Sequence, residues 1–123
     1  MKILFKTMLL IPILFGGIAC AQEPVREVSK VTGDVYRFVN NNHRSVFIIT
    51  GDGVVVTDPI NAEAATWLKA KIEKLTDQPI THLVYSHSHG DHASGGLVFG
   101  EAPNIFAHMN APEAIDGGKS DGS

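Results

Sequence analysis

Hydrophobic and polar positions alternate with a period of two from about residue 27 to residue 57, a pattern typical of short β-strands. Turn-forming residues divide this region into four segments. Gly51-Asp52-Gly53 is the firmest of the turns, because glycine tolerates the positive φ of a tight hairpin. The pattern predicts strands at about residues 27–31, 34–39, 45–50 and 53–57, arranged as an antiparallel meander.

The period then changes to that of a helix. Asn61 can cap this helix, and apolar residues follow at helical spacing, namely Ala65, Leu68, Ile72 and Leu75. Asp77-Gln78-Pro79 should stop it. A strand at residues 80–85, a histidine-rich loop, a short strand near 104–107 and a helical start near 110–115 come next. Strands followed by alternating helix and strand predict a layered α/β or α+β domain.

The first 21 residues resemble a secretory signal peptide, with a positive start, an apolar run and the small residues Ala19-Cys20-Ala21. We expect cleavage after Ala21 and a secreted or periplasmic protein. The apolar run at 8–21 is shorter than the roughly 20 residues of a membrane span, so none is expected after cleavage. Two alternatives stay open: a retained anchor helix, or a lipoprotein modified at Cys20.

Composition narrows the class of protein further. The chain has 123 residues, 44% of them hydrophobic, and one cysteine, which excludes a chain that is a disordered tail as a whole, a disulfide scaffold and a multi-domain enzyme. Removing 21 of the 123 residues leaves 102; Lys plus Arg then falls from 10 to 8 while Asp plus Glu stays at 13, a net charge of −5. Such a chain has no electrostatic basis for binding nucleic acid.

Four candidate metal ligands stand within six positions after the strand at 80–85: His87, His89, Asp91 and His92. Imidazole nitrogens and carboxylate oxygens are ligands of zinc, and iron or manganese are alternatives. Extended backbone would point His87 and His89 the same way, toward one ion. Asp91 and His92 follow Gly90, which can turn the chain toward a second site. The spacing therefore predicts two neighbouring ions.

This HxHxDH segment, followed by Gly95-Gly96, resembles the metal-binding signature of the metallo-β-lactamase-fold hydrolases. The segment Val54–Pro59 resembles the family's earlier strand with its terminal aspartate. The resemblance covers residues 27 to about 115 and implies the N-terminal half of an αββα sandwich. It also implies a hydrolytic zinc centre that acts on a small-molecule substrate.

The same resemblance implies a role for each ligand. His87 and His89 would bind the first zinc, Asp91 and His92 the second, and Asp58 would support the metal loop. A metal-bound hydroxide would attack an ester, thioester, amide (β-lactam) or sulfate. Asp91, the candidate catalytic residue, would hold that hydroxide in line and pass a proton to the leaving group.

Complete family members add a histidine, an aspartate and a last histidine from a second half, whereas His108 and Asp116 of this chain stand in other contexts. We therefore expect a truncated domain at 22–115 that is inactive alone, with one apolar sheet face exposed and a disordered tail at 116–123. The alternative is a small non-catalytic metal-binding or partner-binding protein whose site is completed by another subunit. The oligomeric state cannot be predicted.

Other polar residues have plainer interpretations. His43, in the predicted turn at 40–44, is interpreted as a surface-loop histidine, with a place beside a substrate cleft as the alternative. His82 is expected to make a structural contact and Trp67 to pack at the edge of the core. For Asp58, capping of its own turn is the alternative to supporting the metal loop.

Overall fold

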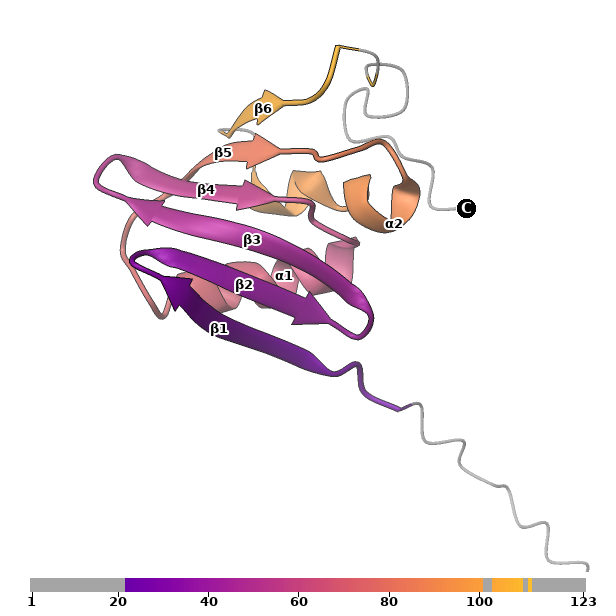
Figure 1. Cartoon of the computed structure of the whole chain (residues 1–123), viewed down its shortest axis with the longest axis horizontal. Coiled ribbons are helices and arrows are strands. Elements are labelled where there is room, and N and C mark those ends of the chain that lie inside the picture. The colour runs from indigo at the N-terminus through magenta and orange to yellow at the C-terminus, as the bar shows by residue number, and fades with distance from the viewer. Residues whose placement is uncertain (1–21, 101–102, 110, 112–123) are drawn as a thin grey trace, which may run out of the picture.

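The computed structural model describes residues 22–100, 103–109 and 111. Within this part of the chain one sheet contains six strands in chain order (Figure 1). They are β1 (Arg26–Thr32), β2 (Val35–Asn40), β3 (His43–Thr50), β4 (Gly53–Thr57), β5 (Ile80–Val84) and β6 (Asn104–Phe106). The first four pair antiparallel, as predicted, and β5 and β6 continue the sheet in parallel with β4.

Several predictions fall outside the described residues. These are the signal peptide at 1–21, the tail at 116–123 and, apart from Ala111, the helical start at 110–115. The domain boundaries at 22 and 115 likewise stay predictions.

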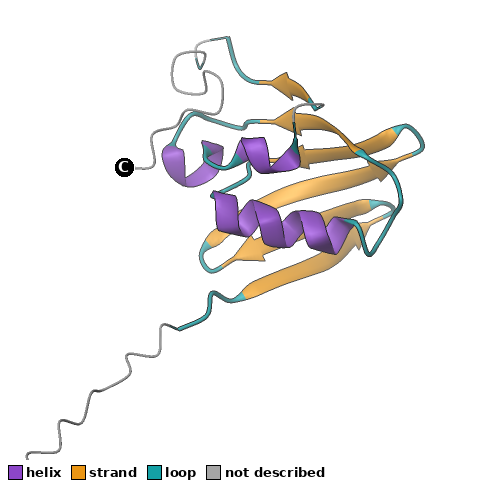
Figure 2. Cartoon of the chain, turned by 180° about the vertical axis from the view of Figure 1, so that it is seen from behind, coloured by secondary structure: helices purple, strands orange, loops and turns teal. Residues whose placement is uncertain are grey.

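The helices lie together on one face of the sheet (Figure 2). They are α1 (Ala62–Ile72), α2 (Gly90–Ala93) and the 3-10 helix η1 (Gly96–Phe99). One sheet with one helical layer is the expected α/β arrangement and half the layers of the expected sandwich. Among the described helices, none has the length and apolar content to cross a membrane.

Helix α1 begins as predicted but ends earlier. The Asn61 side chain accepts a hydrogen bond from the Ala64 N–H at 2.8 Å, which caps the first turn. The predicted continuation to Leu75 is wrong: α1 ends at Ile72, and Leu75 is 48% exposed. The Leu75 N–H donates to the Ile72 carbonyl three residues back, so the chain leaves the helix in a tight turn before it reaches Pro79.

The core lies between the sheet and α1. Phe38 and Phe47 are fully buried in the sheet, and Leu68 is fully buried on the helix. Trp67 stacks on Phe38 with ring centroids 5.6 Å apart and is partly buried, which confirms its place at the edge of the core. Apolar burial on this one face therefore holds the described unit together.

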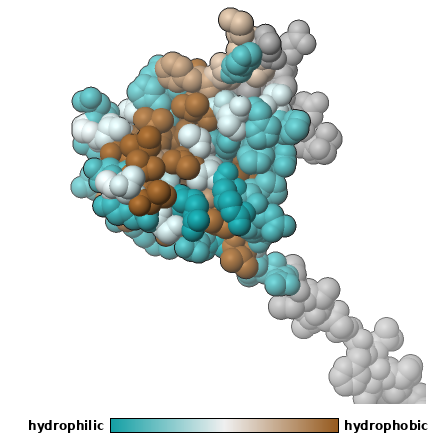
Figure 3. All heavy atoms as spheres, viewed as in Figure 1, coloured by the Kyte–Doolittle hydropathy of each residue, from teal (hydrophilic) through white to brown (hydrophobic). Residues whose placement is uncertain are grey.

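The opposite face of the sheet is not covered by any described helix. Apolar side chains gather over its middle (Figure 3). Val46 and Ile48 of β3 are 36% and 38% exposed, while their neighbour Phe47 points into the core. The expected exposed apolar face is therefore present in the described part of the chain, and such a face is typical of a surface that another element covers.

Gly95 offers a test of how the loop after α2 packs on α1. A Cβ at Gly95 (φ 84°) would lie 2.5 Å from the Ala62 nitrogen and the Asn61 carbonyl carbon, which are backbone atoms that cannot move aside. We expect Gly95→Ala to lower the free energy of unfolding by about 2 to 5 kcal/mol in urea titrations.

Gly51→Ala is the matched control, because its Cβ would meet no atom of the described residues within 4 Å and its φ is not positive. It should change the free energy of unfolding by no more than about 0.5 kcal/mol. Equal unfolding midpoints for the two variants would contradict this packing.

Candidate metal centre

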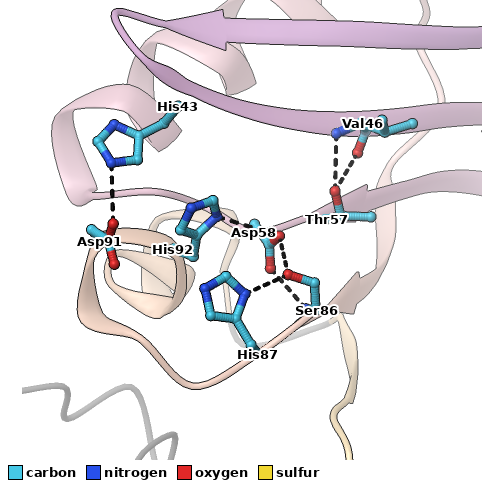
Figure 4. Close-up of polar contacts among 8 residues, drawn as sticks. All are labelled: His43, Val46, Thr57, Asp58, Ser86, His87, Asp91 and His92. Carbon is cyan, nitrogen blue, oxygen red and sulfur yellow. Dashed lines mark hydrogen bonds and ion pairs between the residues drawn. The ribbon is translucent and has the colours of Figure 1, made fainter.

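Sheet topology brings three segments to one edge of the sheet. Because β4 and β5 are parallel, with Thr57 opposite Val84, both carboxyl ends point to that edge. Strand β3 is antiparallel to β4, so its first residue, His43, lies at the same edge. The α2 residues Asp91 and His92 complete the cluster. His43 and Asp91 lie on one side of His92, and Asp58, Ser86 and His87 on the other (Figure 4).

Asp58 connects the ends of β4 and β5. Its buried carboxylate accepts hydrogen bonds from the Ser86 N–H at 2.8 Å and the Ser86 hydroxyl at 2.6 Å. The two residues are 28 positions apart. Capping of its own turn, the alternative interpretation, therefore does not describe these contacts. Asp58 instead fixes the first residue of the histidine loop.

This contact also orients His87. The single hydroxyl hydrogen of Ser86 points to Asp58, so His87 Nδ1, 2.8 Å from Ser86 Oγ, must be the donor of their hydrogen bond. A neutral imidazole with its hydrogen on Nδ1 has a free lone pair on Nε2. The chain of hydrogen bonds from His87 to Asp58 thus selects the tautomer that can bind a metal through Nε2.

The connection from β4 to α1 is conformationally strained. Asp58 and Ile60 have φ values of 34° and 72°, and Ile60 is a buried β-branched residue, for which a positive φ is rare. The Ile60 N–H donates to the His92 carbonyl at 3.0 Å. This strained backbone therefore holds α2 against the end of β4.

His92 is the centre of the cluster. Its ring lies 4.5 Å from that of His87 and 5.4 Å from that of His43, centroid to centroid. Its Nδ1 is buried, has no hydrogen-bond partner within the described residues, and lies 3.6 Å from a carboxylate oxygen of Asp58. Buried polar atoms without a partner are uncommon, and this nitrogen fits a metal-binding role.

Two groups of three residues can bring their donor atoms together. In each group the ligand atoms lie within 4.8 Å of one another: one group is His43, Asp91 and His92, the other Asp58, His87 and His92. A set of imidazole nitrogens and carboxylate oxygens suits a divalent metal such as zinc. The residues present therefore fit the metal that the sequence pattern predicts.

Asp91 is ionised at neutral pH. Desolvation alone would raise its pKa. The hydrogen bond with His43, a backbone hydrogen bond and the charges of His92 and His43 outweigh desolvation and lower the pKa of Asp91 below its ordinary value. A deprotonated carboxylate is the form that binds metal.

Within the part of the chain that the structure describes, three of the four predicted ligands belong to the donor groups and the fourth does not. His87, Asp91 and His92 belong to the two donor groups, whereas His89 is exposed and belongs to neither group among the described residues, although its ring lies 4.9 Å from that of His87. The division of ligands between two ions stays a prediction.

The residue that the sequence interpretation missed is His43. The favoured interpretation is a surface-loop histidine, with a place beside a substrate cleft as the alternative, and neither names it as a metal ligand. In the structure it lies against Asp91 and His92 with its side chain 35% exposed. A period-two count places it on the same face of β3 as Phe47, but the sequence alone does not indicate that this is the buried face. His82, by contrast, makes the expected structural contact, stacking on Phe106 at 5.8 Å.

A mixed sheet with helices on one face, and a cluster of histidines and aspartates at the carboxyl ends of its parallel strands, defines a metal-binding α/β domain. The family model described as the metallo-beta-lactamase superfamily matches residues 40–121. The chain belongs to this superfamily. No curated protein matches it significantly.

Solved structures show the same fold. The native FEZ-1 metallo-β-lactamase from Legionella gormanii is 25% identical with a TM-score of 0.68, over 82% of this chain and 41% of that one. A metallo-β-lactamase from Hirschia baltica is 19% identical with a TM-score of 0.64, over 73% and 46%. FIM-1 from Pseudomonas aeruginosa is 15% identical with a TM-score of 0.62, over 76% and 46%. The chain thus spans less than half the length of each.

Because Asp58 accepts two hydrogen bonds from Ser86, removing its carboxylate should lower the stability of the protein even without metal. Asp58→Ala leaves the Ser86 N–H and hydroxyl without their acceptor and should lower the free energy of unfolding by about 1 to 3 kcal/mol in the presence of a chelator. Asp58→Asn keeps one acceptor oxygen for the Ser86 N–H and should lose less. Urea titration followed by circular dichroism measures both.

Asp52→Ala, which removes an exposed carboxylate in the β3–β4 turn, is the control and should change stability by no more than about 0.5 kcal/mol. The stabilising role of the Asp58–Ser86 contact is refuted if Asp58→Ala is as stable as this control.

Proposed function

We propose that this chain provides one half of a zinc-dependent hydrolase site of the metallo-β-lactamase superfamily. The proposed substrate is a small molecule with an ester, thioester, amide (including β-lactam) or sulfate group. The observation that carries the proposal is the convergence of His87, Asp91 and His92 at one sheet edge, with a buried His92 nitrogen that lacks a hydrogen-bond partner among the described residues. Membership of the superfamily supports it.

Zinc is proposed because the converging donors are imidazole nitrogens and carboxylate oxygens, although iron or manganese accept the same ligands. When bound, such a metal supplies Lewis acidity and lowers the pKa of a coordinated water to about 7. The side chains of the protein would bind the metal and transfer protons.

Each of those side chains has a distinct task. His87 presents Nε2 because Ser86 and Asp58 hold its Nδ1–H. Asp91 stays ionised near neutral pH, so it can bind metal and accept a proton from the attacking water. It is exposed enough to return that proton to a leaving group.

The proposed activity belongs to the complete two-layered fold. Catalytic zinc sites usually have three protein ligands and an open position. We propose that a second half, carried by a longer polypeptide or another subunit, supplies further ligands and covers the apolar face around Val46 and Ile48. The proposed setting is secreted or periplasmic, on the strength of the signal-like segment at residues 1–21.

Metal binding is the first consequence to measure. We expect the chain to retain zinc after gel filtration, and His87→Ala to weaken zinc binding by at least about 10-fold in competition with a chromophoric chelator. His82→Ala is the matched control, because it removes a histidine that lies outside both donor groups. A chain that retains no zinc, or equal affinities for the two variants, would rule out the proposed metal site.

The reading frame after Ser123 tests the hydrolytic part. A frame that supplies a histidine, an aspartate and another histidine supports the hydrolase. Its product should then hydrolyse a nitrophenyl ester, a thioester, a chromogenic β-lactam or a nitrophenyl sulfate with zinc, and lose this activity in His87→Ala. A frame without such residues, together with near-stoichiometric zinc in a defined oligomer, would favour the non-catalytic binding protein instead.

A further inference from the structure

His43 meets the metal cluster from a different segment than the other ligands. Its Nε2 lies 3.2 Å from the Asp91 Oδ2, although the two residues are 48 positions apart. Its ring stands edge-on to that of His92, with centroids 5.4 Å apart. The side chain points from the start of β3 toward Asp91 on α2 (Figure 4).

The separation of these donors suits a shared metal. Two ligands on a tetrahedral zinc with bonds of 2.0 to 2.1 Å are about 3.3 Å apart. The His43–Asp91 distance of 3.2 Å is close to that value and at the long end of the range for a hydrogen bond. His92 brings a third donor within 4.8 Å of both. His43 and Asp91 are therefore already separated as two ligands of one metal are, with His92 close enough to be the third.

The turn that carries His43 is held in place on both sides. Asn41 has a left-handed φ of 53°, and it exchanges hydrogen bonds with Val25: the Asn41 N–H donates to the Val25 carbonyl at 2.8 Å, and the Val25 N–H donates to Asn41 Oδ1 at 2.9 Å. Arg26 donates to the side chains of Asn40 at 2.8 Å and Glu63 at 2.7 Å, which ties the turn to α1. His43 is thus preorganised rather than carried on a loose loop.

We infer that His43 is a metal ligand, and that His43, Asp91 and His92 together bind one divalent cation such as zinc. The inference rests on the proposed function, because it assumes that the cluster binds metal. It departs from the expected ligand set, in which Asp91 and His92 await a ligand from a second half. Here His43, at the start of β3, supplies the third ligand, so one chain provides the three protein ligands usual in a catalytic zinc site.

A cobalt experiment tests whether position 43 touches the metal. His43→Cys, made in the full chain with Cys20→Ser, places the only thiol at that position. On titration with Co²⁺ we expect a thiolate-to-cobalt charge-transfer band in the near ultraviolet, because such a band requires sulfur bound to the metal. Asn42→Cys in the same background is the control, since Asn42 is exposed in the same turn. Co²⁺ bound to His43→Cys without the band would overturn the inference.

Zinc affinity separates a ligand from a residue that only positions Asp91. His43→Gln can still donate a hydrogen bond to Asp91 but replaces the imidazole. If His43 is a ligand, both His43→Gln and His43→Ala should weaken zinc binding at this site by about 100-fold or more. Mutation of a residue that only orients a ligand already weakens metal binding by about 10- to 100-fold. Affinity of His43→Gln within a few-fold of the unmodified chain would overturn the inference.

The two proposals fail in different ways. If the unmodified chain binds neither zinc nor cobalt, the proposed metal site itself is wrong. If it binds both, and His43→Gln and His43→Ala bind zinc as tightly as the unmodified chain, only the ligand role of His43 is wrong. Circular dichroism of each variant checks that it is folded, and the partly exposed position of His43 predicts that it will be.

Discussion

The hydrogen bonds from Ser86 to the buried Asp58 carboxylate are the interaction on which the candidate site depends. A buried charge is costly unless it is paired and hydrogen-bonded. Asp58 has two hydrogen bonds from Ser86, and His92 Nδ1 lies 3.6 Å away. These contacts join the ends of the parallel strands β4 and β5 and orient His87 through the Ser86 hydroxyl. The same carboxylate therefore determines where the histidine loop starts and which nitrogen of His87 is free.

The packed domain also holds the C-terminal end of the histidine loop in place. Gly95 packs against the backbone at the start of α1, and a Cβ at Gly96 would collide with the Tyr85 hydroxyl. Burial and then the nearby charge of Asp58 raise the pKa of Tyr85, so its hydroxyl stays neutral beneath the cluster. Both ends of the segment from Ser86 to Gly96 are therefore fixed to the packed domain, and fixed ends favour the preorganisation that a metal site requires.

The sequence predicted the strands, the start of α1 and the ligand segment, because each depends on local pattern and turn residues. It could not decide which face of β3 is buried, since Val46 and Ile48 are as apolar as Phe47 and Ile49. A shift of one position reverses the two faces, and His43 changes from a surface residue to a partner of Asp91. The short helix α2 was also missed, because four residues show no period. These features follow from tertiary packing, which a single sequence does not contain.

The place of His43 gives metal binding a second consequence, for stability. The segment from residue 22 onward contains no cysteine, so its described core gains nothing from disulfides, and the described helices leave one sheet face uncovered. A cation bound by His43 and Asp91 would link the β2–β3 hairpin to α2 across 48 residues, and so would restrict the unfolded chain as well as fill the site. A ligand that binds only the folded state adds about 2.7 kcal/mol of stability at 100 times its dissociation constant. The metal centre would then stabilise the same hairpin that helps to form it.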